Sequence, residues 1–157
     1  IASGTVASIA FYPIYYLVLS KNSVIAAAQN QLYWISFVLF LIGWWAVDVF
    51  QAKTKTYDHS YVVIDEVLGS AVTVAIALPW LFKLAPLFSP YLSLSKANTA
   101  FVIGVALFRI FDITKPLFIK YVDRYHKGAI GVLLDDILAA IYAAFVAYIA
   151  WKFTYYL

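Results

Sequence analysis

Long apolar stretches alternate with short polar stretches along this chain, which predicts a set of membrane-spanning helices. A helix needs about 20 mostly apolar residues to cross the hydrocarbon core of a bilayer. Tyr and Trp gather at several ends of these stretches, and their rings favour the headgroup layer. The predicted spanning segments are Val6–Ser20, Gln31–Phe50, Tyr61–Phe82, Ala97–Ile113 and Ala129–Lys152.

The composition favours a membrane protein over a soluble helical bundle. Of the 157 residues, 65% are hydrophobic and only 12% are charged, whereas a soluble domain has about 25% charged residues. A single soluble core cannot hide five such segments. We therefore expect one all-α, polytopic membrane bundle of about five transmembrane helices, with residues 1–157 forming a single domain.

Residue types that are missing exclude several kinds of chemistry. The chain has no Cys, which excludes disulfides, thiolate metal ligands and a Cys nucleophile. It has no Met even at position 1, so we expect a processed or incomplete N-terminus, and no basic stretch marks a cleavable signal peptide. The net charge is +3, but the basic residues lie in short loops beside apolar segments. Topology and lipid headgroups explain them better than nucleic acid does.

The distribution of basic residues predicts an orientation. With five spans, the loops 51–60 and 114–128 lie on the same side as the N-terminus, and their excess of positive charge marks that side as cytoplasmic. These loops contain Lys53, Lys55, Lys115, Lys120, Arg124 and Lys127. The basic residues predicted on the opposite side are Lys21, Lys83, Lys96 and Lys152.

The acidic residues give a sharper signal, because all of them fall at or near the predicted cytoplasmic side. None is at the bilayer centre, where a carboxylate costs about 2.5–3.5 kcal/mol or more. Several nevertheless lie inside the ends of apolar segments, where adjacent carboxylates need a counter-charge from Lys, Arg or a divalent cation. Oxygen ligands in this number suit Mg²⁺. The acidic residues are Asp48, Asp58, Asp65, Glu66, Asp112, Asp123, Asp135 and Asp136.

Structural ion pairing is the alternative explanation for these acids. Arg109 and Asp112 are three residues apart and could simply pair on one helix face. The whole set favours more than pairing, because the acids outnumber the basic residues placed well inside the helices. Arg109, Lys115 and Lys127 lie beside the acids, and carboxylates that hold a metal next to cations that hold an anion form a phosphate-ester site. Pro116 predicts that the fourth helix ends near Thr114, which would leave Lys115 pointing at the membrane surface.

Glycines recur on the same helix faces as the acids. Gly69 lies four residues after Asp65, and Gly131 lies four residues before Asp135, so each pair shares a face. A glycine there removes side-chain bulk and lets another backbone or a phosphate come close. Tight helix packing is the alternative, and we prefer it for Gly104.

Four stretches of the chain follow one another in a recognisable order: Ser3–Ser8, Tyr57–His59 with Val63–Gly69, Phe108–Pro116, and Asp123-Arg124 with Lys127–Asp136. Taken together, they resemble the phosphatidylglycerophosphatase A family of bacterial inner-membrane lipid phosphatases. This chain has Ser3 and Ala7 where the family usually has Pro and Gly, and Gly128-Ala129 where it usually has paired glycines. These departures concern the N-terminal loop rather than the acidic residues.

The resemblance implies Mg²⁺-dependent hydrolysis of phosphatidylglycerophosphate to phosphatidylglycerol and phosphate at the cytoplasmic face of the inner membrane. Its acidic motifs include Asp58, Asp65, Glu66, Asp112, Asp135 and Asp136, as metal ligands and, apart from Asp58, as catalytic residues. We expect the two adjacent pairs to hold one or two Mg²⁺, with Asp112 or Asp58 completing the shell. Asp48 falls outside the motifs. The expected substrate-binding residues are Thr5, Ser8, Arg109, Lys115 and Lys127.

Two other classes of membrane protein were weighed against a phosphatase. A small ion channel or transporter also uses intramembrane acids, but an ion path needs polar groups across the full thickness, and here they stop near one face. A CDP-alcohol phosphotransferase needs an Asp-Gly pair, which this chain lacks. The two histidines, His59 and His126, do not form a phosphohistidine pattern. The phospholipid substrate and the membrane are thus the expected partners.

Overall fold

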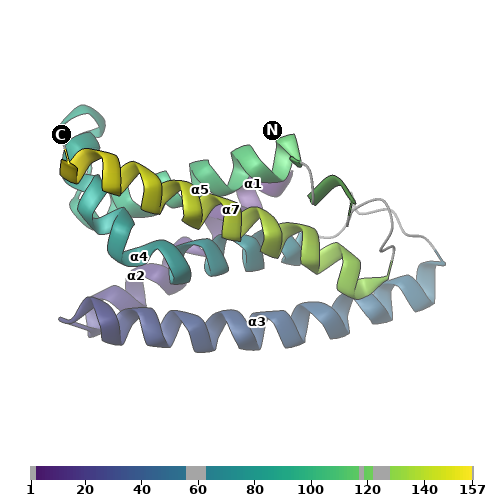
Figure 1. Ribbon diagram of the computed structural model, residues 1–157. Coiled ribbons are helices and arrows are strands. Elements are labelled where there is room, and N and C mark those ends of the chain that lie inside the picture. Colours follow the sequence, from purple (N-terminus) through teal and green to yellow (C-terminus); the bar gives the residue numbers. More distant parts are fainter. Residues whose placement is uncertain (1–2, 56–62, 117–118, 122–127, 157) are drawn as a thin grey trace.

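The computed structural model describes residues 3–55, 63–116, 119–121 and 128–156, and these ranges form an all-α bundle (Figure 1). The predicted fold class is confirmed. The helices are α1 (Ser3–Ala10), α2 (Tyr12–Lys21), α3 (Ile25–Thr54), α4 (Ile64–Leu92), α5 (Lys96–Thr114) and α7 (Ala129–Tyr156).

In the described part of the chain, the helices α3, α4, α5 and α7 are long and apolar enough to cross a membrane. They correspond to the last four predicted segments. The first predicted segment, Val6–Ser20, is instead divided between α1 and α2, which meet at Phe11. Pro13 causes this break, because it has no N–H to donate to the carbonyl of Ile9. The two short helices still follow one another along the bundle (Figure 1).

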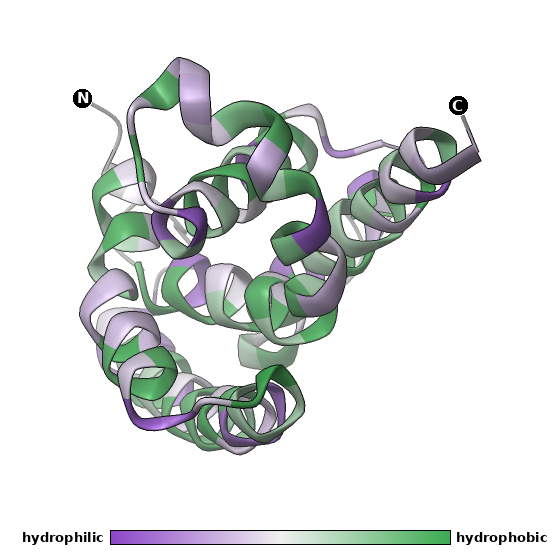
Figure 2. Ribbon diagram, turned by 90° about the vertical axis from the view of Figure 1, so that its left-hand side faces the viewer, coloured by the Kyte–Doolittle hydropathy of each residue, from purple (hydrophilic) through white to green (hydrophobic). Residues whose placement is uncertain are grey.

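The outside of the bundle is apolar, as expected for a protein surrounded by lipid. Large hydrophobic side chains such as Trp34, Trp45 and Ile113 are between 64% and 70% exposed. Figure 2 shows hydrophobic residues on all sides of the bundle rather than on inward faces alone. An exposed apolar surface of this extent is unfavourable in water, so the four long helices define a multi-pass membrane protein.

Helix α4 is the centre of the bundle and packs against α1, α3, α5 and α7. Its partner α7 presents a row of small buried residues to the interior. Small residues let helices approach closely, and close packing is a main source of helix association in lipid. The row consists of Ala139, Ala140, Ala143, Ala144 and Ala147.

The predicted end of the third segment at Phe82 is wrong, because α4 continues to Leu92 and contains Pro79, Pro86 and Pro90. Pro79 leaves the carbonyl of Ala75 without its helical donor. The Gln29 side-chain amide on α3 donates a hydrogen bond to that carbonyl at 2.9 Å. An unpaired carbonyl is costly in lipid, so this contact explains how α4 tolerates Pro79. Sequence reasoning assigned no role to Gln29.

Candidate functional site

Side chains from three helices meet at one end of the bundle. Asp65 and Glu66 lie in the first turn of α4, while Asp135 and Asp136 lie near the start of α7. Asp112 lies near the end of α5. Because α5 runs opposite to α4 and α7, its C-terminal end lies beside their N-terminal ends (Figure 1). The structure therefore brings together five of the predicted catalytic acids.

Arg109 connects α4 and α5 within this group. Its Nη1 atom is 2.7 Å from Asp112 Oδ2 and 3.7 Å from Glu66 Oε1. All three side chains are largely buried, between 14% and 18% exposed. Arg109 therefore does pair with Asp112, as the structural alternative expected. The same guanidinium also faces Glu66, an acid on another helix.

Lys115 closes the other side of the group. It ends α5 in a left-handed conformation (φ 39°), and its N–H donates to the carbonyl of Phe111 at 2.9 Å. The helix thus ends at Thr114, as Pro116 predicted. The prediction that Lys115 points at the membrane surface is wrong, because its Nζ atom donates to Asp135 Oδ2 at 2.6 Å. The buried carboxylate of Asp135 attracts the ammonium group and ties α5 to α7.

The described site has an excess of negative charge. Asp136 interacts electrostatically with Asp112, Asp65 and Asp135, so these carboxylates lie close enough to repel one another. Among the described residues, five carboxylates face two cations, which leaves a formal charge of −3 if all are ionised. Charge of this size in a buried place needs further compensation.

Several buried polar atoms of the site have no hydrogen-bond partner within the described chain. They are Glu66 Oε2, Asp136 Oδ2 and Arg109 Nε. Buried polar groups are nearly always paired, so unpaired acceptors next to an unpaired cationic donor suit a ligand that combines a metal cation with an anion. The hard carboxylate oxygens have the chemistry of a Mg²⁺ site.

The described residues contain no preassembled metal site. No three acidic or histidine side chains within these ranges are gathered as they would be around an ion. Carboxylates repel one another, so gathering them requires a compensating cation. The donor chemistry fits Mg²⁺, while the arrangement of the ligands around it stays a prediction.

Helix α1 lies directly against the acidic group. A Cβ atom added at Gly4 would overlap Glu66 Oε1 and lie 2.7 Å from Arg109 Nη1, so a larger residue there would require the ends of these two side chains to move. Ser8 is fully buried, and its hydroxyl donates to the Gly4 carbonyl at 2.8 Å. The hydroxyl that was predicted to bind phosphate thus donates within α1 in this structure, and its role toward a phosphate stays a prediction. Thr5 is half-buried beside Gly4.

The structure does not place every residue named in the sequence analysis. Asp58 and Lys127 lie outside the described residues, as do His59 and Asp123. Asp48 is exposed on α3, in agreement with its exclusion from the predicted motifs.

The fold and the site define a multi-pass helical membrane protein whose buried carboxylates lie beside an arginine and a lysine. The sequence matches the phosphatidylglycerophosphatase A family over residues 1–151. The chain belongs to this family, which confirms the resemblance carried by its four motifs and makes it a member of a phosphatase family.

Individual relatives agree with this assignment. Phosphatidylglycerophosphatase A of Haemophilus influenzae is 35% identical over 111 residues, which are 69% of this chain and 57% of that protein. Phosphatidylglycerophosphatase A of Escherichia coli is 29% identical over 94% of this chain and 73% of its own length. A putative phosphatidylinositol-3-phosphatase of Bacteroides thetaiotaomicron is 29% identical over 90% of this chain and 76% of its own length. No solved structure matches the chain.

Proposed function

We propose that this protein hydrolyses phosphatidylglycerophosphate to phosphatidylglycerol and inorganic phosphate. The observation that carries the proposal is the group of buried carboxylates beside Arg109 and Lys115 at one end of the bundle. At the end of a membrane bundle, such a site can receive a phosphorylated headgroup while the acyl chains stay in lipid. The two relatives named phosphatidylglycerophosphatase A support this choice of substrate.

Mg²⁺ belongs to the proposal as a further counter-charge for the described carboxylates. Asp65, Glu66, Asp135 and Asp136 would hold it, with Asp112 completing the set. The unpaired oxygens of Glu66 and Asp136 support this assignment, because they are buried acceptors without a donor in the described chain. When bound, the metal supplies positive charge that polarises the phosphate and activates water.

The cations of the site neutralise charge on the phosphoryl group. The Nη1 atom of Arg109 donates a hydrogen bond to Asp112. Its Nε atom has no partner in the described chain and would donate to a phosphate oxygen. The planar guanidinium suits phosphate, and Lys115 adds a point charge. Both would stabilise negative charge that grows on the phosphoryl oxygens during the reaction.

The site is proposed to face the cytoplasm across the inner membrane. The segments 51–60 and 114–128, which flank this end of the bundle, carry most of the basic residues of the chain. An excess of Lys and Arg marks cytoplasmic loops.

Phosphate release from phosphatidylglycerophosphate in detergent, with Mg²⁺ and with EDTA, tests the proposal. We expect release with Mg²⁺ and its loss in EDTA, and slower release from phosphatidylinositol 3-phosphate. No release from phosphatidylglycerophosphate would refute the substrate, and ion flux in liposomes without any phosphate release would favour the channel alternative.

Mg²⁺ binding is tested separately by thermal unfolding of the protein in detergent. A ligand that binds only the folded state raises the midpoint of unfolding, so Mg²⁺ should raise it and EDTA should reverse the rise. An unchanged midpoint at saturating Mg²⁺ would remove the metal from the proposal even if the enzyme is active.

A further inference from the structure

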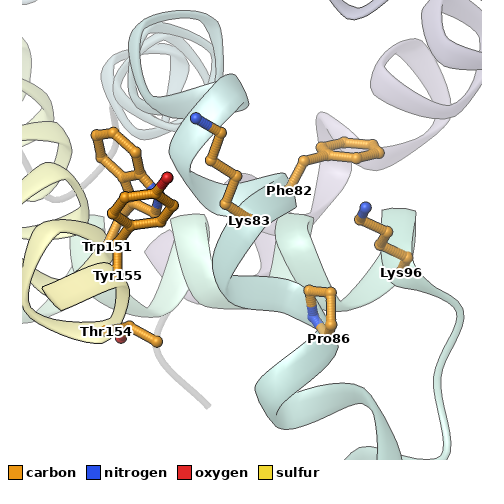
Figure 3. A pocket seen from close by; sticks show the side chains of 7 residues that line it. All are labelled: Phe82, Lys83, Pro86, Lys96, Trp151, Thr154 and Tyr155. Atoms are coloured by element: carbon orange, nitrogen blue, oxygen red, sulfur yellow. The ribbon is translucent and has the colours of Figure 1, made fainter. Parts of the chain in front are cut away.

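A groove of about 380 Å³ lies at the end of the bundle opposite the acidic site. It is formed by the last turns of α4 and α7 and the first turn of α5, and its side chains surround a common space (Figure 3). The lining residues are Phe82, Lys83, Pro86, Lys96, Trp151, Thr154 and Tyr155. Its walls are therefore mostly aromatic and aliphatic, with two ammonium groups among them.

Both lysines of the groove are positioned by aromatic rings. Lys83 Nζ lies 4.1 Å from the centroid of the Trp151 ring, and Lys96 Nζ lies 5.7 Å from that of Phe82. A ring face attracts a cation without neutralising its charge. The ammonium groups are thus held at the groove while they keep their full positive charge.

Among the described residues, no acidic side chain lies at this end of the bundle. The segments 1–47, 67–111 and 137–157 contain no acidic residue. All residues that line the groove belong to the last two of these segments. The described acids that form the catalytic group lie at the other end of α4, α5 and α7. The groove therefore combines apolar walls with two ammonium groups that no described acidic side chain neutralises.

The aromatic residues place the groove at the depth of lipid headgroups. Trp151 packs against Tyr148 and Tyr155, with ring centroids 5.9 and 6.1 Å apart, and Trp80 packs against Tyr148 at 5.2 Å. Trp and Tyr in such clusters favour the boundary between hydrocarbon and water. An occupant of the groove would thus have its polar part among headgroups and its apolar part in lipid.

We propose that this groove binds one anionic phospholipid of the leaflet opposite the catalytic site. Lys83 and Lys96 would contact its phosphate, and an acyl chain would lie along Phe82 and Pro86. Lysine ammonium groups bind phosphate as point charges, and the apolar walls select a lipid over a free anion. This inference concerns a second site and is independent of the proposed phosphatase activity.

Native mass spectrometry of the purified protein in neutral detergent tests the proposal, with phosphatidylglycerol and phosphatidylcholine of equal acyl chains as probes. We expect the wild type to retain one more phosphatidylglycerol than Lys83→Gln/Lys96→Gln, and to show no such preference for phosphatidylcholine. Lys21→Gln/Lys152→Gln is the matched control, because it removes two charges from the same end outside the groove lining. It should retain phosphatidylglycerol as the wild type does.

If the wild type and Lys83→Gln/Lys96→Gln retain equal amounts of phosphatidylglycerol, the proposal is overturned. It is also overturned if the control Lys21→Gln/Lys152→Gln loses as much phosphatidylglycerol as Lys83→Gln/Lys96→Gln does. Release of phosphate from detergent-dispersed phosphatidylglycerophosphate should be unchanged in both double variants, which verifies that they are folded. Lys96→Gln alone provides a second test if the double variant does not fold. It should weaken retention of phosphatidylglycerol, and retention equal to wild type would contradict the assigned contact.

Discussion

At the scale of single residues, the site depends on carboxylates that the fold keeps almost completely out of solvent. Asp65, Asp135 and Asp136 are between 3% and 8% exposed. A helical membrane protein gains little stability from such groups, because removing a charge from water is costly even when it is paired. Their burial beside Arg109 and Lys115 therefore indicates a function for the charge itself.

Asp65→Asn is expected to lower Mg²⁺-dependent phosphate release by about 100-fold or more, the scale of losing one catalytic group. The amide has the shape of the carboxylate but not its charge, so the variant should stay folded in detergent. Asp48→Asn is the control, because Asp48 is exposed on α3 outside the group, and its activity should stay close to wild type. If Asp65→Asn keeps most of the activity, Asp65 does not belong to the catalytic core.

Asp136→Asn is expected to separate stability from function. Asp136 faces three other carboxylates, and its Oδ2 atom has no partner in the described chain. Removing its charge relieves repulsion, so the midpoint of thermal unfolding without Mg²⁺ should stay equal or rise. Added Mg²⁺ should no longer raise that midpoint. A large Mg²⁺-dependent rise in this variant would contradict a role for Asp136 in holding the metal.

At the scale of helices, the packing of α5 against α4 determines where the side chains of the site lie. Gly69 lies one turn from Asp65, and a Cβ atom added there would overlap the ring of Phe108 on α5. The close approach of α4 and α5 sets Arg109, the next residue along α5, near Glu66. The glycine that the sequence placed on the carboxylate face therefore serves helix packing, which in turn positions the guanidinium.

Gly69→Ala is expected to destabilise the protein by about 1–3 kcal/mol, the usual cost of overpacking a core. It should also lower activity, because Phe108 and Arg109 must move with α5. Unfolding in detergent and phosphate release measure the two effects. Gly128→Ala is the control, since an added Cβ atom there meets nothing within 4 Å. Equal effects of the two substitutions would rule out the Phe108 contact as the cause.

Gln29→Leu is expected to destabilise the protein by about 0.6–2 kcal/mol, the range for a hydrogen bond between membrane helices. The loss arises because the Ala75 carbonyl, which Pro79 leaves without a helical donor, loses the Gln29 amide. A double-mutant cycle with Pro79→Ala checks this reason, because the restored N–H should make Gln29→Leu less harmful. Asn30→Leu, at an exposed neighbouring position, should have little effect. Additive effects of the two substitutions would contradict the explanation.

At the scale of the whole molecule, the two ends of the bundle have opposite charge character. The described acids gather where α4 and α7 begin, while Lys83, Lys96 and Lys152 lie where α4 ends, α5 begins and α7 ends. The middle of the bundle between them is closed by apolar clusters that contain residues such as Leu78 and Leu81. This polarity suits an enzyme that works at one membrane surface.

The chain has no Cys, so single cysteines can report the orientation of the bundle. We expect Lys83→Cys to react with a membrane-impermeant maleimide on intact cells, and Lys53→Cys to react only after the membrane is opened. The reason is that Lys53 belongs to the side with the larger number of basic loop residues. The reverse labelling pattern would place the acidic site outside the cytoplasm.

Hydropathy alone predicted the all-α membrane bundle, and proline chemistry alone predicted the end of α5 at Thr114. These features follow from the sequence because transfer into lipid and the missing proline N–H act on each segment separately. The gathering of the acids near one membrane face also follows from their positions between the apolar stretches.

Other features required the tertiary structure, because they arise between residues far apart in the chain. The Ala75 carbonyl, which Pro79 leaves without a helical donor, is paired by the Gln29 amide on another helix, 46 residues away in the chain. Lys115 turns inward toward a carboxylate 20 residues away, and Gly4 lies where α1 meets the side chains of Glu66 and Arg109. Local patterns decide which residues enter the membrane, whereas packing decides which of them touch, since the energy of each contact depends on where its partner lies.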